Sequence, residues 1–165
     1  MKKLLVPATL AAITVIAIAV ASGSAQTAGG RTLTLFENVA NESNSLVDNA
    51  PKSPAKNPDS ASFRLSRGDE LVGRTPLLDH KGGTRVGTSY FQATVAKGRK
   101  FEGAVLQAQV VLALRDGNLV LEGLAGSTDN PLAVVGGTGA YEGARGQTTE
   151  KETDHGAVLT IQLLP

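Results

Sequence analysis

Apolar and polar residues alternate in short runs from position 31 to the end of the chain, and glycine, asparagine, aspartate and proline separate these runs. Alternation with a period of two predicts half-buried β-strands, and turn residues at regular intervals predict hairpins between them. The pattern therefore predicts an all-β domain of about eight strands. They lie at residues 31–37, 69–78, 84–96, 101–115, 118–125, 131–136, 144–152 and 156–164.

The turns between these runs favour antiparallel pairing. Arg115–Asn118 places Asp-Gly between two alternating runs, which is the strongest short-range hairpin signal. Residues 79–84 and 154–156 have the composition of looser turns. Residues 43–62 contain three prolines among polar residues, so they are expected to form a long loop, with at most one helical turn near Asn44–Asp48.

Antiparallel strands joined by hairpins can close into a barrel, and closure removes the exposed edges of the sheet. A barrel of eight strands has an interior wide enough for side chains or for one small ligand. We therefore expect an eight-stranded antiparallel β-barrel. A sandwich of two sheets shows the same alternation and is the alternative architecture.

The first 25 residues have the organisation of a secretory signal peptide. Two lysines precede an apolar run at residues 4–21, and Gly23 and Ala25 are small enough for a cleavage site. The alternative is an uncleaved anchor, because the run approaches the roughly 20 residues that span a bilayer. Pro7 interrupts the run and no basic cluster follows it. These features favour cleavage after Ala25, a secreted or periplasmic protein, and no stable membrane span after processing.

Residues 26–165 are expected to form one domain, because the 140 residues that remain after cleavage suffice for a single core. This part carries 14 basic and 15 acidic residues. Without a basic field, nucleic acid is not an expected partner. The chain contains no cysteine, which excludes thiol nucleophiles, disulfides and Cys-type zinc sites.

Five glycines lie within the fourteen residues 134–147, which is the only segment with the spacing of a phosphate-binding loop. A dinucleotide loop needs a helix after its glycines, and a mononucleotide loop needs a closing Lys-Ser or Lys-Thr pair. The segment has neither, so we expect no nucleotide and no other cofactor. The glycines instead predict turns in which the chain crosses a packed neighbour closely. Tyr141, alone among them, is expected to plug a barrel end or pack on the sheet.

The segment "LAVVGGTGAYEGARGQ" at residues 132–147 resembles the "VVGGTG" segment of dirigent proteins and the "ITGGAG...EGAYGQ" segment of plant allene oxide cyclases. Residues 68–87 and 117–123 are similar in order and spacing to two further segments of the cyclases. The resemblance runs from about Gly68 to Thr148. It implies an eight-stranded antiparallel barrel, commonly a homotrimer, that binds a small apolar molecule in its mouth.

The resemblance also makes Glu37 the predicted catalytic residue. In the cyclases, a carboxylate at the end of the first strand assists charge separation in the substrate, and Phe36 and Glu37 match that segment. Glu37 shares a strand face with Leu33 and Leu35. If that face lines the cavity, desolvation raises the pKa of Glu37. The alternative is a solvated carboxylate at the end of a strand.

Five further residues are candidates for substrate binding: Arg74, Tyr90, Gln107, Gln109 and Tyr141. An arginine can recognise a ligand carboxylate, and one of two adjacent aromatic residues on a strand faces inward. The two glutamines would supply polar groups to an apolar cavity if they point inside. Each candidate also has a structural interpretation, such as an outward arginine or a tyrosine that fills the core.

The family pattern differs at Val39, Thr75 and Ala125, so allene oxide cyclase activity itself is not expected. The pairs Asp79-His80 and Asp154-His155 lie in predicted turns without a third ligand, so no metal site is predicted. Two functions remain nearly equal: a cofactor-free isomerase or cyclase for a reactive apolar substrate, and a dirigent-like or lipocalin-like binding barrel. A structural envelope protein is the third alternative.

Overall fold

The computed structural model describes residues 30–54, 61–98, 100, 103–126 and 131–165. The predicted signal peptide at residues 1–25 lies outside the described residues, and its cleavage stays a prediction. In the described part of the chain, no helix is long and apolar enough to cross a membrane.

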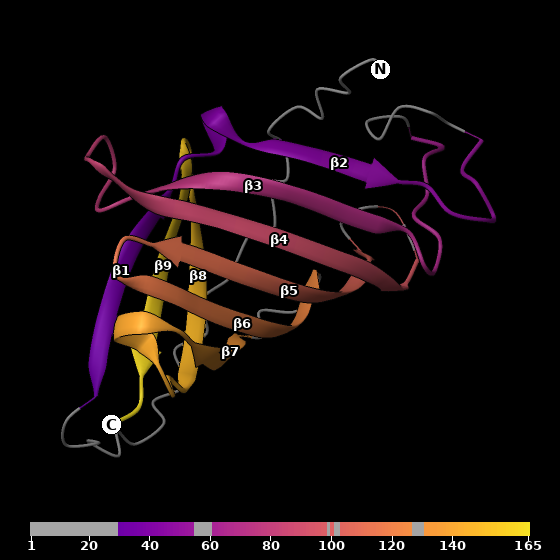
Figure 1. Cartoon of the computed structure of the whole chain (residues 1–165). Helices are drawn as coiled ribbons and strands as arrows, with labels where there is room; N and C mark the ends of the chain where they lie inside the picture. Colours follow the sequence, from indigo (N-terminus) through magenta and orange to yellow (C-terminus); the bar gives the residue numbers. More distant parts are fainter. Residues whose placement is uncertain (1–29, 55–60, 99, 101–102, 127–130) are drawn as a thin grey trace, which may run out of the picture.

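In the described residues, nine β-strands form one antiparallel sheet, which curls until its first and third strands meet (Figure 1). The strands are β1 (Arg31–Glu37), β2 (Ser43–Val47), β3 (Glu70–Leu78), β4 (Arg85–Lys97), β5 (Val105–Leu114), β6 (Gly117–Gly126), β7 (Leu132–Gly137), β8 (Gly146–Thr153) and β9 (Gly156–Leu163). Their order is β1-β9-β8-β7-β6-β5-β4-β3-β2, and β1 also pairs with β3. Eight strands thus close a barrel, which confirms the predicted architecture and excludes the open sandwich.

The ninth strand, β2, corrects the expectation that residues 43–62 begin as a loop with a helical turn at Asn44–Asp48. Ser43–Val47 pairs along the first half of β3, on the edge whose second half pairs with β1. The backbone groups of this edge need partners, and β2 supplies them. The sequence signal was weak because only Leu46 and Val47 of this strand are apolar.

The register assigns alternate side chains to the inside of the barrel. Leu35 of β1 lies opposite Leu159 of β9. Inward-facing apolar side chains form two separate clusters. The end cluster consists of Leu35, Leu77, Leu112, Leu119, Leu121, Val134, Tyr141, Leu159 and Ile161. The loop cluster consists of Phe63, Leu65, Val95 and Ala104, with Leu46, Leu71 and Leu106 packed against it. Since Leu77 and Leu71 lie at opposite ends of β3, the two clusters fill opposite ends of the barrel.

Asp69 anchors the segment that carries the loop cluster. Its side chain is only 1% exposed. The carboxylate accepts hydrogen bonds from the backbone N–H of Ser66 at 2.7 Å, from the Ser66 hydroxyl at 2.9 Å and from the backbone N–H of Asn49 at 2.9 Å. These bonds tie Asn49 and Ser66 to the start of β3, close in sequence to Phe63 and Leu65, which pack in the loop cluster.

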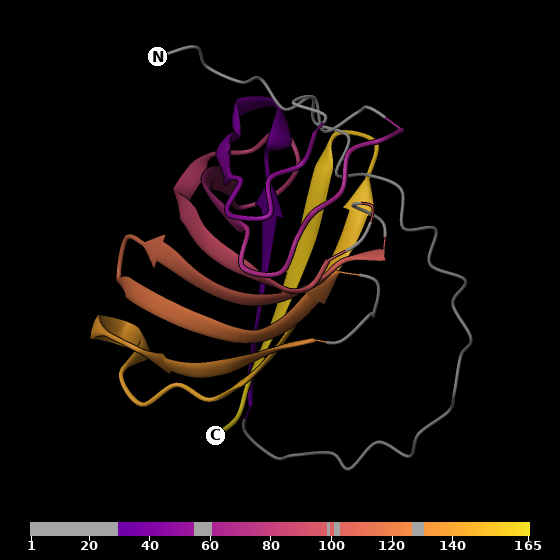
Figure 2. The ribbon, with the colours of Figure 1, turned by 90° about the vertical axis from the view of Figure 1, so that its right-hand side faces the viewer.

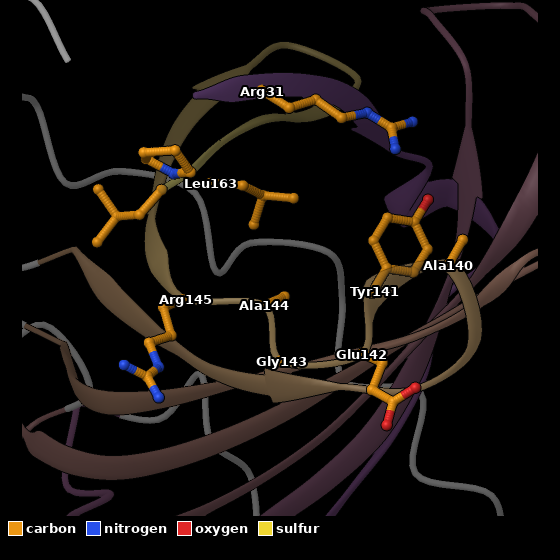
Figure 3. Close-up of a pocket in the computed structure, with 10 residues that line it drawn as sticks. Arg31, Ala140, Tyr141, Glu142, Gly143, Ala144, Arg145 and Leu163 are labelled. Atoms are coloured by element: carbon orange, nitrogen blue, oxygen red, sulfur yellow. The ribbon is translucent and has the colours of Figure 1, made fainter. Parts of the chain in front are cut away.

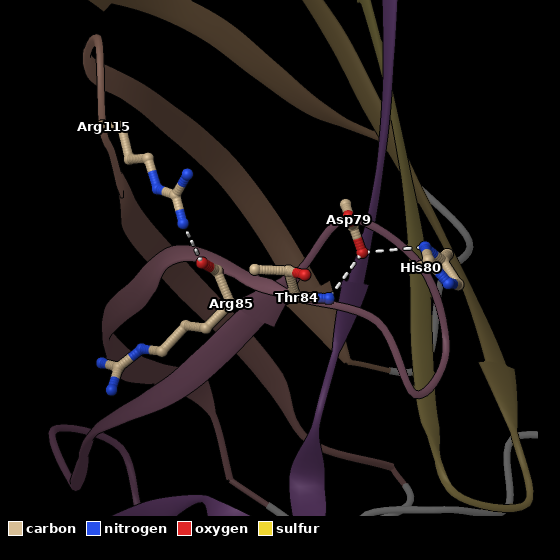
Figure 4. A network of polar contacts seen from close by, with 5 residues as sticks. All are labelled: Asp79, His80, Thr84, Arg85 and Arg115. Atoms are coloured by element: carbon tan, nitrogen blue, oxygen red, sulfur yellow. Dashed lines mark hydrogen bonds and ion pairs between the residues drawn. The ribbon is translucent and has the colours of Figure 1, made fainter.

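Turn contacts tie the hairpins together at the other end (Figure 4). Arg115 donates a hydrogen bond to the carbonyl oxygen of Arg85 at 3.0 Å, which joins the β5–β6 turn to the start of β4. Asp79 accepts a hydrogen bond from the Thr84 N–H at 2.9 Å and pairs with His80 at 2.8 Å. The His80 side chain is 74% exposed. This Asp-His pair therefore belongs to a solvated turn.

The glycine-rich segment crosses the end of the barrel between β7 and β8. A short 3-10 helix, η3 (Gly139–Tyr141), follows β7 and brings Tyr141 onto the end cluster, where its side chain is 7% exposed. A Cβ atom on Gly137 would lie 2.4 Å from the carbonyl oxygen of Tyr141 and 2.7 Å from that of Asn118. Close chain crossing thus explains this glycine, as the sequence predicts.

We expect Leu119→Ala to lower the free energy of unfolding by about 2–5 kcal/mol, because it removes a fully buried side chain from the end cluster. Leu124→Ala on the same strand is the matched control, since Leu124 is 46% exposed. Urea unfolding followed by circular dichroism measures both. Equal losses in the two variants would contradict the assigned inner face of β6.

Gly137→Ala is expected to destabilise the fold by about 1–3 kcal/mol, because the new methyl group collides with two backbone carbonyls. The neighbouring Gly136→Ala is the control: a Cβ there meets nothing within 4 Å. It is expected to be neutral or to stabilise the strand by up to about 1 kcal/mol. Thermal unfolding distinguishes the two, and a neutral Gly137→Ala would refute the close crossing.

Candidate functional site

Small side chains line the middle of the barrel, between the end cluster and the loop cluster. At this level of β3 to β6 the inward-facing residues include seven small ones: Gly73, Thr75, Ser89, Ala93, Ala108, Gly123 and Ala125. We call them the small-residue belt. Phe91, Val110 and Leu121 are larger inward-facing residues of the same strands. Phe91 is half-buried and lies over Gly73, where a Cβ atom would be 2.5 Å from its ring.

The opposite wall consists of β1, β9 and β8, which run steeply across the direction of the other strands (Figures 1 and 2). This wall carries carboxylates on its inner face. Glu37 and Glu152 flank Ala157 from the two sides, and Glu150 lies opposite Leu159.

A fourth carboxylate follows the short 3-10 helix η1 (Val39–Asn41). It belongs to Glu42, which accepts a hydrogen bond from the inward-facing Asn44 at 2.9 Å. We call Glu37, Glu42, Glu150 and Glu152 the lumen carboxylates.

Water reaches the lumen carboxylates although they face the inside of the barrel. Glu37 is half-buried, and Glu150 is exposed. By contrast, Leu159 and Ile161 on the same wall are only 4% and 0% exposed. The glutamates of this wall therefore reach solvent, whereas the apolar residues further along the same strands do not.

Glu37 is the most perturbed of these carboxyl groups. Burial, the nearby charge of Glu150 and the charge of Glu42 raise its pKa from 4.5 to about 8, although a hydrogen bond with Ser89 opposes the shift. The pKa of Glu150 is also raised, first by burial and then by the charges of Glu152 and Glu42. Glu37 therefore carries a proton at neutral pH for most of the time, and it is poised to donate or accept one.

Among the described residues, no basic side chain forms an ion pair with a lumen carboxylate. Arg31 shares the inward face of β1, but it lies at the closed end of the barrel, which the end cluster fills. Its guanidinium carbon is 5.7 Å from the centre of the Tyr141 ring. Lys151, between two lumen carboxylates in sequence, has the outward orientation on β8. The negative charge inside the barrel is thus not balanced by the described residues.

Thr148 is a further polar group on this wall. It faces inward between Leu132 of β7 and Ile161 of β9, two residues before Glu150 on the same face of β8. Its side chain is 4% exposed, and its hydroxyl has no hydrogen-bond partner in the described structure.

Of the residues that the sequence singled out, the structure brings Glu37 to the lumen and Tyr141 to its closed end. Arg74, Tyr90, Gln107 and Gln109 are exposed on the outer face. Their strands turn Thr75, Phe91 and Ala108 inward instead. Phe91 is therefore the aromatic residue of the lumen.

Sequence reasoning missed Glu42, Glu150 and Glu152. The segment 147–152 is polar on both faces, so the pattern contains no sign of which face is buried. The spacing of Thr148, Glu150 and Glu152 placed them on one face, and this was the available signal.

Tyr141 also borders a shallow depression of about 340 Å³ at the outer surface of the closed end (Figure 3). Arg31, Glu142 and Arg145 line it, together with the last three residues of the chain. Its charged groups have mixed sign and are solvated. Tyr141 packs on the end cluster, so it contributes to this depression and not to the wall that carries the lumen carboxylates.

Several solved structures have a similar barrel. A pyocyanin demethylase is 19% identical, with a TM-score of 0.58 over 81% of this chain and 99% of that chain. A pterocarpan synthase dirigent protein is 19% identical, with a TM-score of 0.55 over 92% and 96%. An exo-specific intermolecular Diels-Alderase is 19% identical, with a TM-score of 0.56 over 86% and 98%.

No protein-family model matches the sequence, and no curated protein matches it. At this level of identity, the structural likeness shows a shared fold. The chain therefore has the closed-barrel fold that dirigent and Diels-Alderase proteins also have, which agrees with the dirigent-like resemblance of its glycine-rich segment.

The raised pKa of Glu37 predicts how stability depends on pH. The folded protein binds this proton more tightly than the unfolded chain, whose glutamate has a pKa near 4.5. The contribution of Glu37 to stability is therefore greatest below about pH 4.5 and declines as the pH rises towards about 8. We expect Glu37→Gln to flatten this decline and to be more stable than the wild type at about pH 8.

Urea unfolding at several pH values between about 5 and 8 measures this effect. Glu122→Gln is the control, because Glu122 is an exposed glutamate on the outer face of β6. It should retain the slope of the wild type. A Glu37→Gln variant with the same slope as the wild type would show that Glu37 does not titrate with a raised pKa.

Proposed function

We propose that the barrel binds a small, largely apolar molecule in its lumen and promotes its isomerisation or cyclisation without a cofactor, with Glu37 as the acid-base group. One observation carries the proposal: a carboxyl group with a pKa of about 8 faces the small-residue belt. General acid-base catalysis is most effective when the pKa of the group lies near the operating pH.

The surroundings of Glu37 support this role. A hydrogen bond with Ser89, a member of the small-residue belt, orients its carboxyl group. Phe91 offers an apolar surface for the substrate. The lumen thus combines an apolar wall with few polar groups, which is typical of ligand sites. The similar fold of a Diels-Alderase supports the idea that such a barrel can hold reacting molecules.

The second candidate function is a binding barrel that has no chemical step of its own. The structure of a dirigent protein that matches 92% of this chain favours it. In this case Glu37 orients a ligand whose reaction is driven elsewhere. The two functions differ in whether the purified protein alone converts its ligand.

Export and assembly form part of the proposal. The apolar segment near the N-terminus supports secretion or a periplasmic location, with cleavage after Ala25. The resemblance to the cyclases supports a homotrimer. Mass spectrometry of the exported protein and its elution in size-exclusion chromatography address these two points.

The proposed function is tested first by mass spectrometry of small molecules that stay bound when the protein is purified from its own host. The retained molecule and its chemical precursors then serve as substrates. We expect Glu37→Gln to lower the turnover rate by about 10²- to 10⁴-fold, the usual contribution of a general acid-base group. Binding should change little, because glutamine preserves the shape of the side chain.

Glu122→Gln is the control here as well and should retain full turnover. Conversion by Glu37→Gln at the rate of the wild type would refute the catalytic role. If the wild type binds the molecule without converting it, the binding barrel is the correct function.

A further inference from the structure

We propose that the ligand of the lumen combines an apolar, ring-sized body with a positively charged nitrogen, and that Glu150 and Glu152 hold this charge. This inference rests on the proposed function, because it concerns the same lumen and names the chemical class of its ligand.

The negative charge of the lumen carboxylates is not balanced by the described residues. Four glutamates share the lumen, and no described basic residue pairs with any of them. Carboxylates in partly desolvated surroundings need a counter-charge or a proton. A proton on Glu37 neutralises one carboxyl group. Glu150 and Glu152 lie two residues apart on the same face of β8, and a cation between or above them would relieve their mutual repulsion.

The separation of the glutamates indicates the kind of cation that they can hold. Glu37 and Glu152 are separated by the width of β9, because Ala157 lies between them. Neighbouring strands are about 4.8 Å apart, so the Cα atoms of these glutamates are separated by about 9–10 Å. Among the described residues, no group of three metal-ligating side chains could hold a metal ion. A spread of this size suits an organic cation, and the residue between the two glutamates, Ala157, has a small side chain.

Thr148 supports a lumen ligand independently of the carboxylates. Thr148 lies on the inward face of β8, and its buried hydroxyl has no hydrogen-bond partner in the described structure. Native proteins satisfy most buried polar groups, so a hydroxyl of this kind indicates a missing partner. Thr148 lies about 7 Å along β8 from Glu150. A polar atom of a ligand whose charge lies at Glu150 could reach this hydroxyl.

The lumen also contains an aromatic surface, which Phe91 supplies. The ring of Phe91 lies over Gly73 and is half-buried. An aromatic ring at this position can pack against a flat apolar body, and its face also attracts a cation. Ala93 and Ala108, paired on the neighbouring strands, present only methyl groups to the lumen. Charge, hydroxyl and aromatic surface together define a ligand that is cationic at one side and apolar over the rest.

Three bicyclic compounds of similar size test the inference by isothermal titration calorimetry: the cation 1-methylquinolinium, neutral quinoline and the anion 1-naphthoate. The titrations use the full chain at low salt and mildly alkaline pH. We expect 1-methylquinolinium to bind about tenfold or more tightly than quinoline, as one charged contact can provide. The anion should bind most weakly.

The double variant Glu150→Gln/Glu152→Gln should lose this preference, so that the cation and quinoline bind within about twofold of each other. Glu122→Gln, on the outer face, should retain it. The single variant Glu152→Gln should show an intermediate preference for the cation over quinoline. It replaces the double variant in this test if the double variant does not fold. A double variant or a single variant that keeps the full preference would overturn the assignment of the charge to these residues.

The outcomes separate this inference from the proposed function. If quinoline or 1-naphthoate binds as tightly as the cation, the cationic class is wrong, whereas a lumen that binds small molecules stands. If none of the three compounds binds to the wild type, this inference fails, whereas the proposed function is decided by the experiment with the retained molecule. If the preference for the cation depends on Glu150 and Glu152 but Glu37→Gln does not affect turnover, only the catalytic role of Glu37 fails.

Discussion

The short pairing between β1 and β3 is the contact on which both the barrel and its site depend. Only two residue pairs form it, Phe36 with Leu78 and Glu37 with Leu77. It closes the sheet, and it turns Glu37 inward at the end of β1. The remaining edge of β3 is left to β2, which brings Glu42 and Asn44 towards the same lumen. Closure therefore brings an acidic group into an enclosed space where its pKa rises.

The two ends of the barrel interior and its middle have different roles. The end cluster and the loop cluster supply the buried apolar surface that stabilises the fold. The small-residue belt contributes little to this burial, and the lumen carboxylates oppose it by their repulsion. A barrel selected for stability alone would fill its middle with larger apolar residues. The small and acidic residues at this level are the ones that the proposed ligand would contact.

The sign of the lumen charge distinguishes the inference drawn here from a general hydrophobic site. An apolar pocket that contains one carboxyl group with a raised pKa accommodates many neutral substrates. Three further glutamates and an unpartnered hydroxyl restrict the choice. The proposed ligand would compensate charge on the wall formed by β1, β9 and β8 and pack against Phe91.

The amino-acid sequence by itself determined eight of the strands, most turns and the role of the glycine-rich crossing, because alternation and turn chemistry are local properties of the chain. The family resemblance of its segments made Glu37 a candidate. It did not determine which face of each strand points inward where both faces are polar, as at Thr148, Glu150 and Glu152. It also did not reveal β2, whose partner is an edge far away in sequence. Only closure of the sheet decides these points, since inside and outside do not exist before β1 meets β3.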